Sequence, residues 1–157
     1  MIFDPEVETR PVSEQFEIDR AQYRRQIAYL FEQSAFYQHK LAEAGFNSPE
    51  DVGGLDDIAQ LPFTEKDEIR STQAEVPPFG AHVAADPAQL RRVFSTSGTT
   101  GVPCYLGLTE ADLDMYATNV ARGYTAAGFS RGQKVVVGFN AGPFVAGAVY
   151  YGFDKIG

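Results

Sequence analysis

The sequence predicts an α/β protein in which a helical N-terminal segment is followed by the first strands of a layered, incomplete subdomain. In the first half of the chain, apolar residues recur at helical spacing. In the second half, two short apolar runs, 90–94 and 104–108, flank a turn-rich loop, and a valine-rich run follows a further helical stretch. This order of strand, loop, strand, helix, strand and helix is the start of an α/β layer. The predicted divisions are an N-terminal arm (1–18), a helical segment (19–88) and the α/β subdomain (89–157).

The N-terminal segment opens with roughly a dozen residues that lack any periodicity, which predicts an arm. A long helix is expected next, because apolar side chains recur at spacings of three and four, and Gly45 stands where a C-terminal cap belongs. We assign the aromatic side chains of this helix to the protein core rather than to a ligand. The predicted face consists of Tyr23, Ile27, Leu30, Ser34, Tyr37 and Leu41.

Two shorter helices are predicted from their start signals. Ser48 and Pro49, followed by acidic residues, have the cap, the first-turn proline and the negative first turn of one helix. Thr64 together with Asp67 predicts the cap of another, which Pro77-Pro78 prevents from continuing. Both segments are given a structural role.

The last part of the chain is expected to alternate between helix and strand. Thr109 opens a helix whose acidic first turns suit the helix dipole, and Gly128 ends it. Lys134–Phe139 predicts a strand buried on both faces, entered from the polar turn 130–133. The uncharged run 142–153 predicts a helix that is apolar all round and must be covered on several sides. We therefore expect a fragment of a longer enzyme, or one of two pieces that complete a fold together.

The most informative segment is the loop between the two apolar runs, which holds five hydroxyls and two glycines. Glycine lets backbone N–H groups approach a ligand closely, while Ser and Thr hydroxyls donate to oxyanions without the help of a lysine. The loop is not a Walker A motif, because Gly98 and Gly101 are too close together and an extended segment follows. A hairpin loop that binds phosphate is predicted. Its candidate residues are Ser95, Thr96, Ser97, Gly98, Thr99, Thr100 and Gly101.

This loop resembles the phosphate-binding loop of the adenylate-forming enzymes, the superfamily of acyl-CoA synthetases, luciferases and peptide-synthetase adenylation domains. Three neighbouring segments, Leu61–Arg70, Pro78–Gly80 and Leu108–Leu113, narrow the match. In this order and spacing they are similar to the N-terminal third of phenylacetate-CoA ligases. The resemblance covers residues 20 to 157 and implies the start of an adenylate-forming N-terminal subdomain.

The resemblance also implies a reaction. A small carboxylic acid is activated with ATP as an acyl-adenylate and then transferred to the thiol of coenzyme A. The protein's task is to position the reactants and neutralise charge, so no protein nucleophile is needed. In this family the magnesium ligand, the adenine and ribose contacts and the catalytic lysine lie beyond the point matched by residue 157. We expect Mg²⁺ to be required, and the 157-residue chain by itself to be inactive.

Two departures from the family pattern are visible. Most relatives carry a lysine just before or after the loop proline, where this chain has Val102 and Cys104, so one positive charge at the triphosphate is missing. Ala141 stands where the family often has a second tyrosine, which implies a wider acid pocket.

The segment after the predicted last strand is where an open α/β sheet places ligands. Its candidate substrate-binding residues are Phe139, Asn140, Ala141 and Phe144, with the two phenylalanines equally suited to the core.

Composition excludes several other functions. The net charge of −8 is concentrated in residues 1–90, which disfavours nucleic acid, and residues 91–157 are slightly basic, which suits one small anion. His39 and His82 are far apart and there is one cysteine, so no metal-ligand spacing exists. Cys104 is interpreted as a small strand residue.

The sequence has no signal segment, and its apolar runs fall short of the roughly 20 residues a bilayer needs, so a cytoplasmic protein is expected.

Two alternative functions remain open at this stage. One is an adenylating enzyme with a different acceptor, such as an amine, a deazaflavin hydroxyl or a carrier-protein thiol. The other is a non-catalytic module that binds a partner, or a second copy of itself, through the apolar face of residues 144–153.

Overall fold

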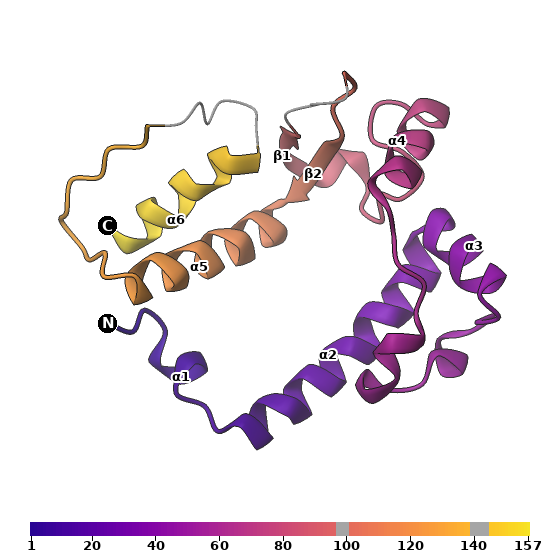
Figure 1. The fold of residues 1–157 in the computed structure, drawn as a ribbon, viewed down its shortest axis with the longest axis horizontal. Coiled ribbons are helices and arrows are strands. Elements are labelled where there is room, and N and C mark those ends of the chain that lie inside the picture. Colours follow the sequence, from indigo (N-terminus) through magenta and orange to yellow (C-terminus); the bar gives the residue numbers. More distant parts are fainter. Residues whose placement is uncertain (97–100, 139–144) are drawn as a thin grey trace. The chain divides into compact units, whose positions relative to one another are not determined.

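The protein is described by a computed structural model that covers residues 1–96, 101–138 and 145–157 (Figure 1). Its contacts divide the chain into two compact units. One unit consists of residues 11–86, and the other of residues 1–10 together with residues 87–157.

The unit 11–86 is helical. Its elements are α2 (Val12–Gln33), α3 (Ala35–Glu43), the 3₁₀ helices η1 (Pro49–Val52) and η2 (Leu55–Gln60), and α4 (Lys66–Glu75). Residues 12–18, expected to form part of an arm, are instead the first turns of α2, which starts directly after Pro11. Proline is well suited to a helix start because it has no N–H to leave unpaired.

The single long helix predicted through Ser34 is wrong, because Ser34 separates α2 from α3. Its backbone is extended (φ −122°, ψ 104°), and its hydroxyl accepts the N–H of Tyr37 at 3.4 Å. A serine hydroxyl that caps a new helix competes with the continuing helix for backbone groups. The apolar periodicity therefore runs across a break that it does not reveal.

The helix start at residues 48–49 is confirmed, whereas the cap predicted for α4 is wrong. The Asp51 carboxylate accepts the N–H of Ser48 at 2.9 Å, as expected for a capped first turn. At α4, the N-cap is Glu65, whose N–H donates to Glu68 Oε2 at 2.6 Å. Asp67 instead pairs with Arg70. The helix ends at Glu75, before the two prolines, as predicted.

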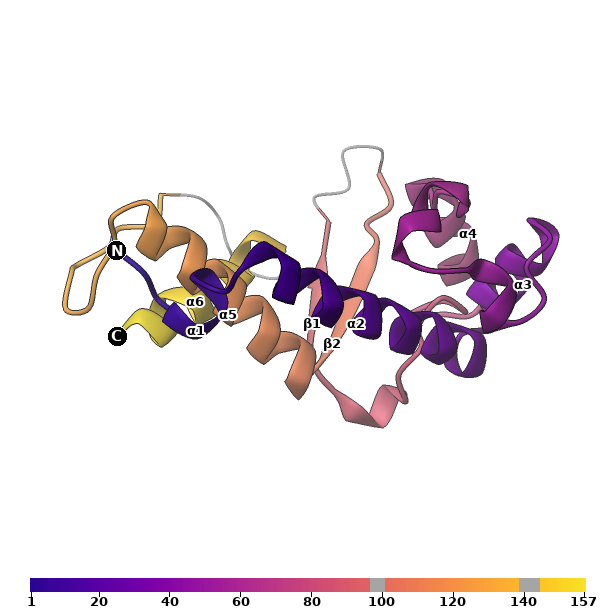
Figure 2. The ribbon, with the colours of Figure 1, turned by 90° about the horizontal axis from the view of Figure 1, so that it is seen from below.

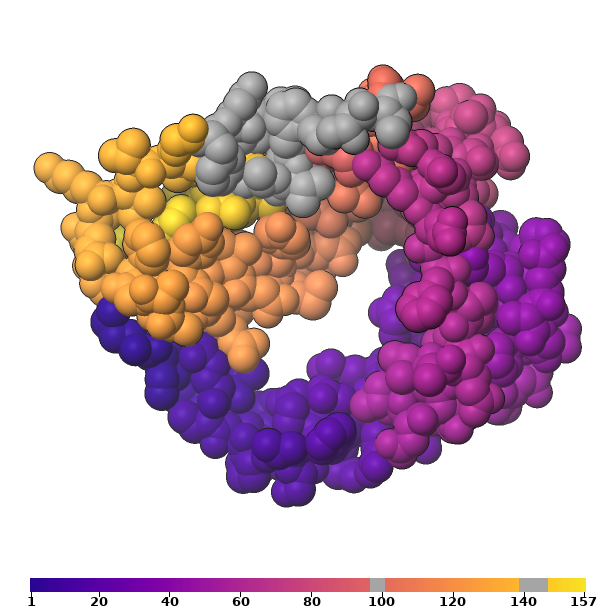
Figure 3. All heavy atoms as spheres, viewed as in Figure 1, coloured from indigo at the N-terminus to yellow at the C-terminus, as the bar shows by residue number. Residues whose placement is uncertain are grey.

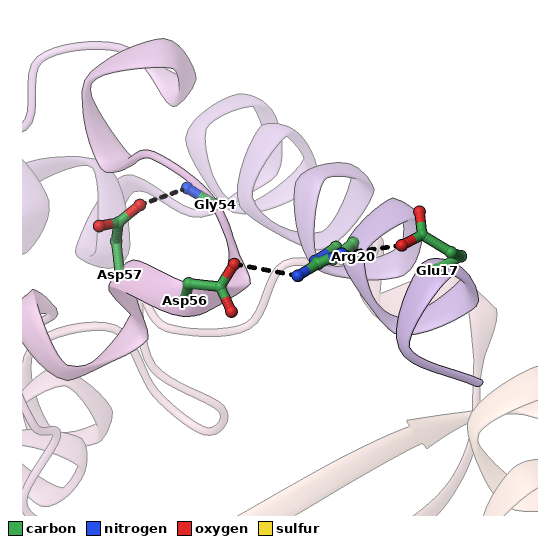
Figure 4. Close-up of polar contacts among 5 residues, drawn as sticks. All are labelled: Glu17, Arg20, Gly54, Asp56 and Asp57. Carbon is green, nitrogen blue, oxygen red and sulfur yellow. Dashed lines mark hydrogen bonds and ion pairs between the residues drawn. The ribbon is translucent and has the colours of Figure 1, made fainter. Parts of the chain in front are cut away.

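Arg20 links α2 to η2 on the surface of this unit. Its guanidinium contacts Glu17 at 2.8 Å in its own helix and Asp56 at 3.2 Å in η2 (Figure 4). The same figure shows the Asp57 carboxylate, which accepts the N–H of Gly54 at 2.9 Å and fixes the start of η2. Because Arg20 and its partners are exposed, these ion pairs add little to stability.

The segment after α4 is held to the helices by polar contacts. Tyr29 donates its hydroxyl proton to the Ala84 carbonyl at 2.9 Å, and Ser34 donates to the His82 carbonyl at 3.3 Å. The His82 ring contacts the Thr72 hydroxyl of α4. The buried apolar residues of this unit include Ile27, Leu41 and Val52.

The second unit contains the predicted hairpin. Strands β1 (Leu90–Ser95) and β2 (Tyr105–Thr109) pair antiparallel, with Ser95 opposite Tyr105, and run side by side in Figures 1 and 2. Helix α5 (Glu110–Ala126) follows immediately. The Asp112 carboxylate accepts the N–H of Thr109 at 3.0 Å, and Gly128 (φ +106°) follows the helix end, so both predicted boundaries are confirmed.

Helix α6 (Val149–Ile156), preceded by η4 (Val145–Ala148), packs along α5, and the two lie together in Figures 1 and 3. Lys155 Nζ lies 2.6 Å from Asp114 Oδ1 across the pair. The short helix α1 (Pro5–Glu8) is joined to α5 through Glu8 and Arg122, 3.3 Å apart. The apolar face of α6 is covered on one side, while Tyr150 remains 44% exposed.

The strand predicted at Lys134–Phe139 is wrong over its described part, because residues 134–138 form no regular element. Val136 is 94% exposed, the opposite of a residue buried on both faces. A strand exists only when a neighbour satisfies its backbone groups. Within the described residues the sheet consists of β1 and β2 alone, so the valine-rich run has no strand to pair with.

Candidate functional site: the base of a hydroxyl-rich hairpin loop

Three of the seven predicted phosphate-loop residues fall in the described part of the chain, namely Ser95, Thr96 and Gly101. Ser97, Gly98, Thr99 and Thr100 lie outside the described residues, as do the four acid-pocket candidates Phe139, Asn140, Ala141 and Phe144. The structure therefore describes the base of the loop, and not its tip.

The loop base is closed by two hydrogen bonds between Thr96 and Cys104. The backbone N–H of Thr96 donates to the Cys104 carbonyl at 2.9 Å. The backbone N–H of Cys104 donates to the Thr96 side-chain oxygen Oγ1 at 3.0 Å. Thr96 directly follows Ser95 and Cys104 directly precedes Tyr105, and Ser95 and Tyr105 form the last strand pair. They therefore fix the distance between the two ends of the loop.

Gly101 is the first described residue on the return side of the loop. Its φ of +98° is a conformation that L side chains rarely adopt, and it is the reason for a glycine here. A Cβ on Gly101 would meet nothing within 4 Å, so the requirement comes from the backbone and not from crowding.

Cys104 is buried, with 3% of its surface exposed, in line with a small strand-edge residue. Val102, at the other position where relatives have lysine, is mostly exposed. The arginines of β1 already have partners. Arg92 Nε donates to the Tyr151 hydroxyl at 2.7 Å, and Arg91 lies 3.5 Å from the Glu110 carboxylate. Both arginines of β1 are thus held by partners in α5 or α6.

A second polar cluster, in the unit 11–86, was not singled out from the sequence. His82 Nδ1 lies 2.8 Å from Thr72 Oγ1, and that hydroxyl donates to the Ile69 carbonyl at 3.0 Å. The hydroxyl therefore accepts from His82, which places the ring proton on Nδ1. Burial lowers the pKa of His82 below its ordinary value. The contact holds the segment after α4 in place, and nothing in the local sequence pattern signals it.

The described residues include no group of three or more His, Cys, Asp or Glu side chains that could hold a metal ion. Across the same residues, every helix is too short or too polar to cross a membrane.

No family model matches the chain. Its sequence is similar to several phenylacetate-coenzyme A ligases, including the following two. One, from Thermus thermophilus, is 35% identical over 97% of this chain and 33% of its own length. The other, from Pseudomonas putida, is 33% identical over 99% of this chain and 34% of its own length. The chain thus spans about a third of the length of these relatives.

Among solved structures, the chain is similar to an open conformation of 2-hydroxyisobutyryl-CoA ligase in complex with 2-HIB-AMP and CoA. The TM-score is 0.83 at 28% identity, over 97% of this chain and 35% of that chain. The fold is therefore that of the N-terminal portion of an adenylate-forming CoA ligase, mostly helical with a small two-stranded sheet, and the predicted fold class is confirmed.

More particularly, the chain is a homologue of phenylacetate-CoA ligases and corresponds to their N-terminal part. The resemblance predicted from the loop and its neighbouring segments is confirmed.

Proposed function

We propose that this chain supplies the phosphate-binding N-terminal part of an ATP-dependent acyl-CoA ligase that activates an aromatic carboxylic acid. The observation that carries the proposal is the pairing of β1 with β2, which are joined by a segment whose sequence contains five hydroxyl residues and two glycines from Ser95 to Gly101. Its support comes from relatives named phenylacetate-coenzyme A ligases and from a structural neighbour in complex with an acyl-AMP and CoA.

In this proposal the loop Ser95–Gly101 binds the β- and γ-phosphates of ATP. Backbone N–H groups and neutral hydroxyls stabilise the charge of the departing pyrophosphate, in place of the lysine that most relatives have. Hydrogen bonds to a charged group are stronger than neutral ones, each contributing about 1.5–3 kcal/mol, so several hydroxyls together can substitute for one cation.

The segment that follows residue 138 is proposed to contact the acid. Phe139 and Phe144 would provide apolar walls, with Asn140 between them on the chain and Ala141 leaving room for a substituent larger than that of phenylacetate. Replacing Ala141 with tyrosine should narrow the range of acids accepted.

Coenzyme A is the proposed acceptor, because the relatives and the structural neighbour are CoA ligases. Mg²⁺ belongs to the proposed reaction, but the described residues offer no cluster to ligate it. None of the chemistry assigned to this chain depends on a metal ligand within it.

A chimera tests the proposal. In the Thermus thermophilus ligase, the third that this chain matches is replaced by residues 1–157. We expect the chimera to form acyl-CoA and pyrophosphate from ATP, coenzyme A, Mg²⁺ and phenylacetate or a substituted phenylacetate. The ligase without its N-terminal third is the background control.

The result that would contradict the proposal is a chimera that is folded and monodisperse by circular dichroism and light scattering but releases no more pyrophosphate than the truncated ligase. An acid-independent release of phosphate would also count against it, since that would indicate a different ATP reaction.

A further inference from the structure

The pair Thr96 and Cys104 departs from a regular antiparallel ladder. In a hydrogen-bonded antiparallel pair, two facing residues exchange both N–H···O=C bonds. Here Thr96 N–H donates to the Cys104 carbonyl at 2.9 Å, but Cys104 N–H donates to the Thr96 hydroxyl oxygen at 3.0 Å, in place of the Thr96 carbonyl. A side chain thus takes over the last bond of the ladder.

This replacement has two consequences for the backbone. The hydroxyl satisfies the backbone N–H of Cys104, a residue only 3% exposed. A buried N–H without a partner would destabilise the fold. Because the carbonyl of Thr96 is released from the ladder, the chain can turn away from the strand direction at this residue. The ladder ends where the loop begins.

We propose that Thr96 is a positioning residue: its hydroxyl, by accepting the N–H of Cys104, fixes the separation and direction of the two ends of the phosphate loop. This assignment rests on the proposed function, and it gives Thr96 a role different from that of the other loop hydroxyls. Thr96 acts through Cys104, and not by contacting phosphate itself.

The residue types at both positions agree with this role. The γ-hydroxyl of Thr96 accepts the bond, and the β-branch of threonine restricts its χ1 rotation, so the acceptor is held in place. Pro103 has no N–H. Cys104 therefore has the only backbone N–H between Val102 and Tyr105.

Two pairs of variants test the proposal in the 157-residue chain. Thr96→Val removes the acceptor at nearly constant volume, whereas Thr96→Ser retains it. Cys104→Pro removes the donor but leaves the Thr96 hydroxyl intact, whereas Cys104→Ala keeps the donor. Thr118→Val is the matched control, since Thr118 is only partly buried on α5 and its hydroxyl donates to the helix carbonyl of Asp114 at 2.8 Å.

The two readouts are amide hydrogen exchange at Cys104 without ligand and calorimetric titration with inorganic pyrophosphate. Thr96→Val should lose protection of the Cys104 amide by about tenfold or more, and Thr96→Ser should retain it. Thr96→Val and Cys104→Pro should both weaken pyrophosphate binding about tenfold or more, with Thr96→Ser, Cys104→Ala and Thr118→Val within about threefold of the unmodified chain.

Normal pyrophosphate binding by a folded Cys104→Pro variant, together with weak binding by Thr96→Val, would overturn the proposal, because Thr96 would then contact phosphate directly. Full protection of the Cys104 amide in Thr96→Val would overturn it as well. If the unmodified chain protects this amide but binds no pyrophosphate, the proposed function itself fails, and Thr96 only closes a hairpin.

Discussion

At the scale of single residues, His82 shows how polar contacts can hold a connecting segment in place. Its Nδ1–H donates to Thr72, a residue only 7% exposed on α4, and its carbonyl accepts from Ser34. The ring also faces Phe36 edge-on, with centroids 6.5 Å apart. A proton added to the free ring nitrogen would bring charge into this half-buried apolar contact, which is why burial lowers the pKa of His82.

The lowered pKa predicts how stability depends on pH. Above the pKa of an unfolded histidine, about 6.5, both states are neutral and the contribution is fully present. As the pH falls below that value, the unfolded chain binds a proton that the folded chain resists, so stability decreases until the folded pKa is reached. Urea midpoints followed by circular dichroism between pH 8 and pH 5 should decrease for the unmodified chain, and the decrease should be smaller for His82→Gln.

His39→Gln is the matched control, because His39 is the other histidine and its side chain is 76% exposed beside Glu43. This variant should keep the pH dependence of the unmodified chain. A slope that disappears in His39→Gln but persists in His82→Gln would show that burial of His82 is not its source.

At the scale of elements, the contact between α5 and α6 depends on small residues. Ala117 and Ala121 of α5 and Gly152 of α6 are buried where the two helices meet. A Cβ built on Gly152 would lie 2.3 Å from Val120 Cγ1 and 3.2 Å from the Ala121 backbone nitrogen. The glycine is therefore required by close approach of the helices, although its φ is not positive.

Gly152→Ala should consequently destabilise the helix pair by about 1–3 kcal/mol, the usual cost of overpacking a close contact. The free energy of unfolding from urea titration is the measurement. Gly123→Ala is the control, since a Cβ at this exposed position of α5 would meet nothing within 4 Å. That change should stabilise α5 by about 0.5–1 kcal/mol through the higher helix propensity of alanine.

Equal effects of the two substitutions would contradict this account of the α5–α6 contact. A destabilisation by Gly123→Ala as large as that by Gly152→Ala would mean that helix packing does not decide the outcome at either position.

Sequence patterns predicted the elements whose ends are marked by local chemistry. The hairpin strands, the Thr109 cap and the Gly128 stop were all found, because each depends on residues within one turn of the chain. The break at Ser34 was missed, since an apolar period continues across it. The predicted strand at 134–138 was wrong because pairing is a property of two segments, and a valine-rich run carries no information about its neighbour.

The same limit applies to the candidate site. Composition identified the loop, since hydroxyls and glycines between two strands are a local signal. The bond from Cys104 to the Thr96 hydroxyl was not predicted, because it joins residues on opposite strands.

At the scale of the whole molecule, the chain corresponds to about a third of the length of its relatives. The helical unit 11–86 holds the whole acidic excess of the chain, whereas the hairpin belongs to the other unit, which has no net formal charge. An anionic ligand is therefore favoured at the hairpin rather than at the helical unit.

The central claim, that the hairpin loop binds the phosphates of ATP during acid activation, is tested most directly by kinetics of the chimeric ligase carrying Thr99→Val and Thr100→Val together. Loss of two donors to charged oxygens, at about 1.5–3 kcal/mol each, should lower kcat/KM for adenylation by roughly a hundredfold or more. The thermal midpoint should stay close to that of the Thr118→Val chimera. A double variant that adenylates normally while its midpoint falls would contradict the claim, because the two hydroxyls would then be structural bonds of the hairpin.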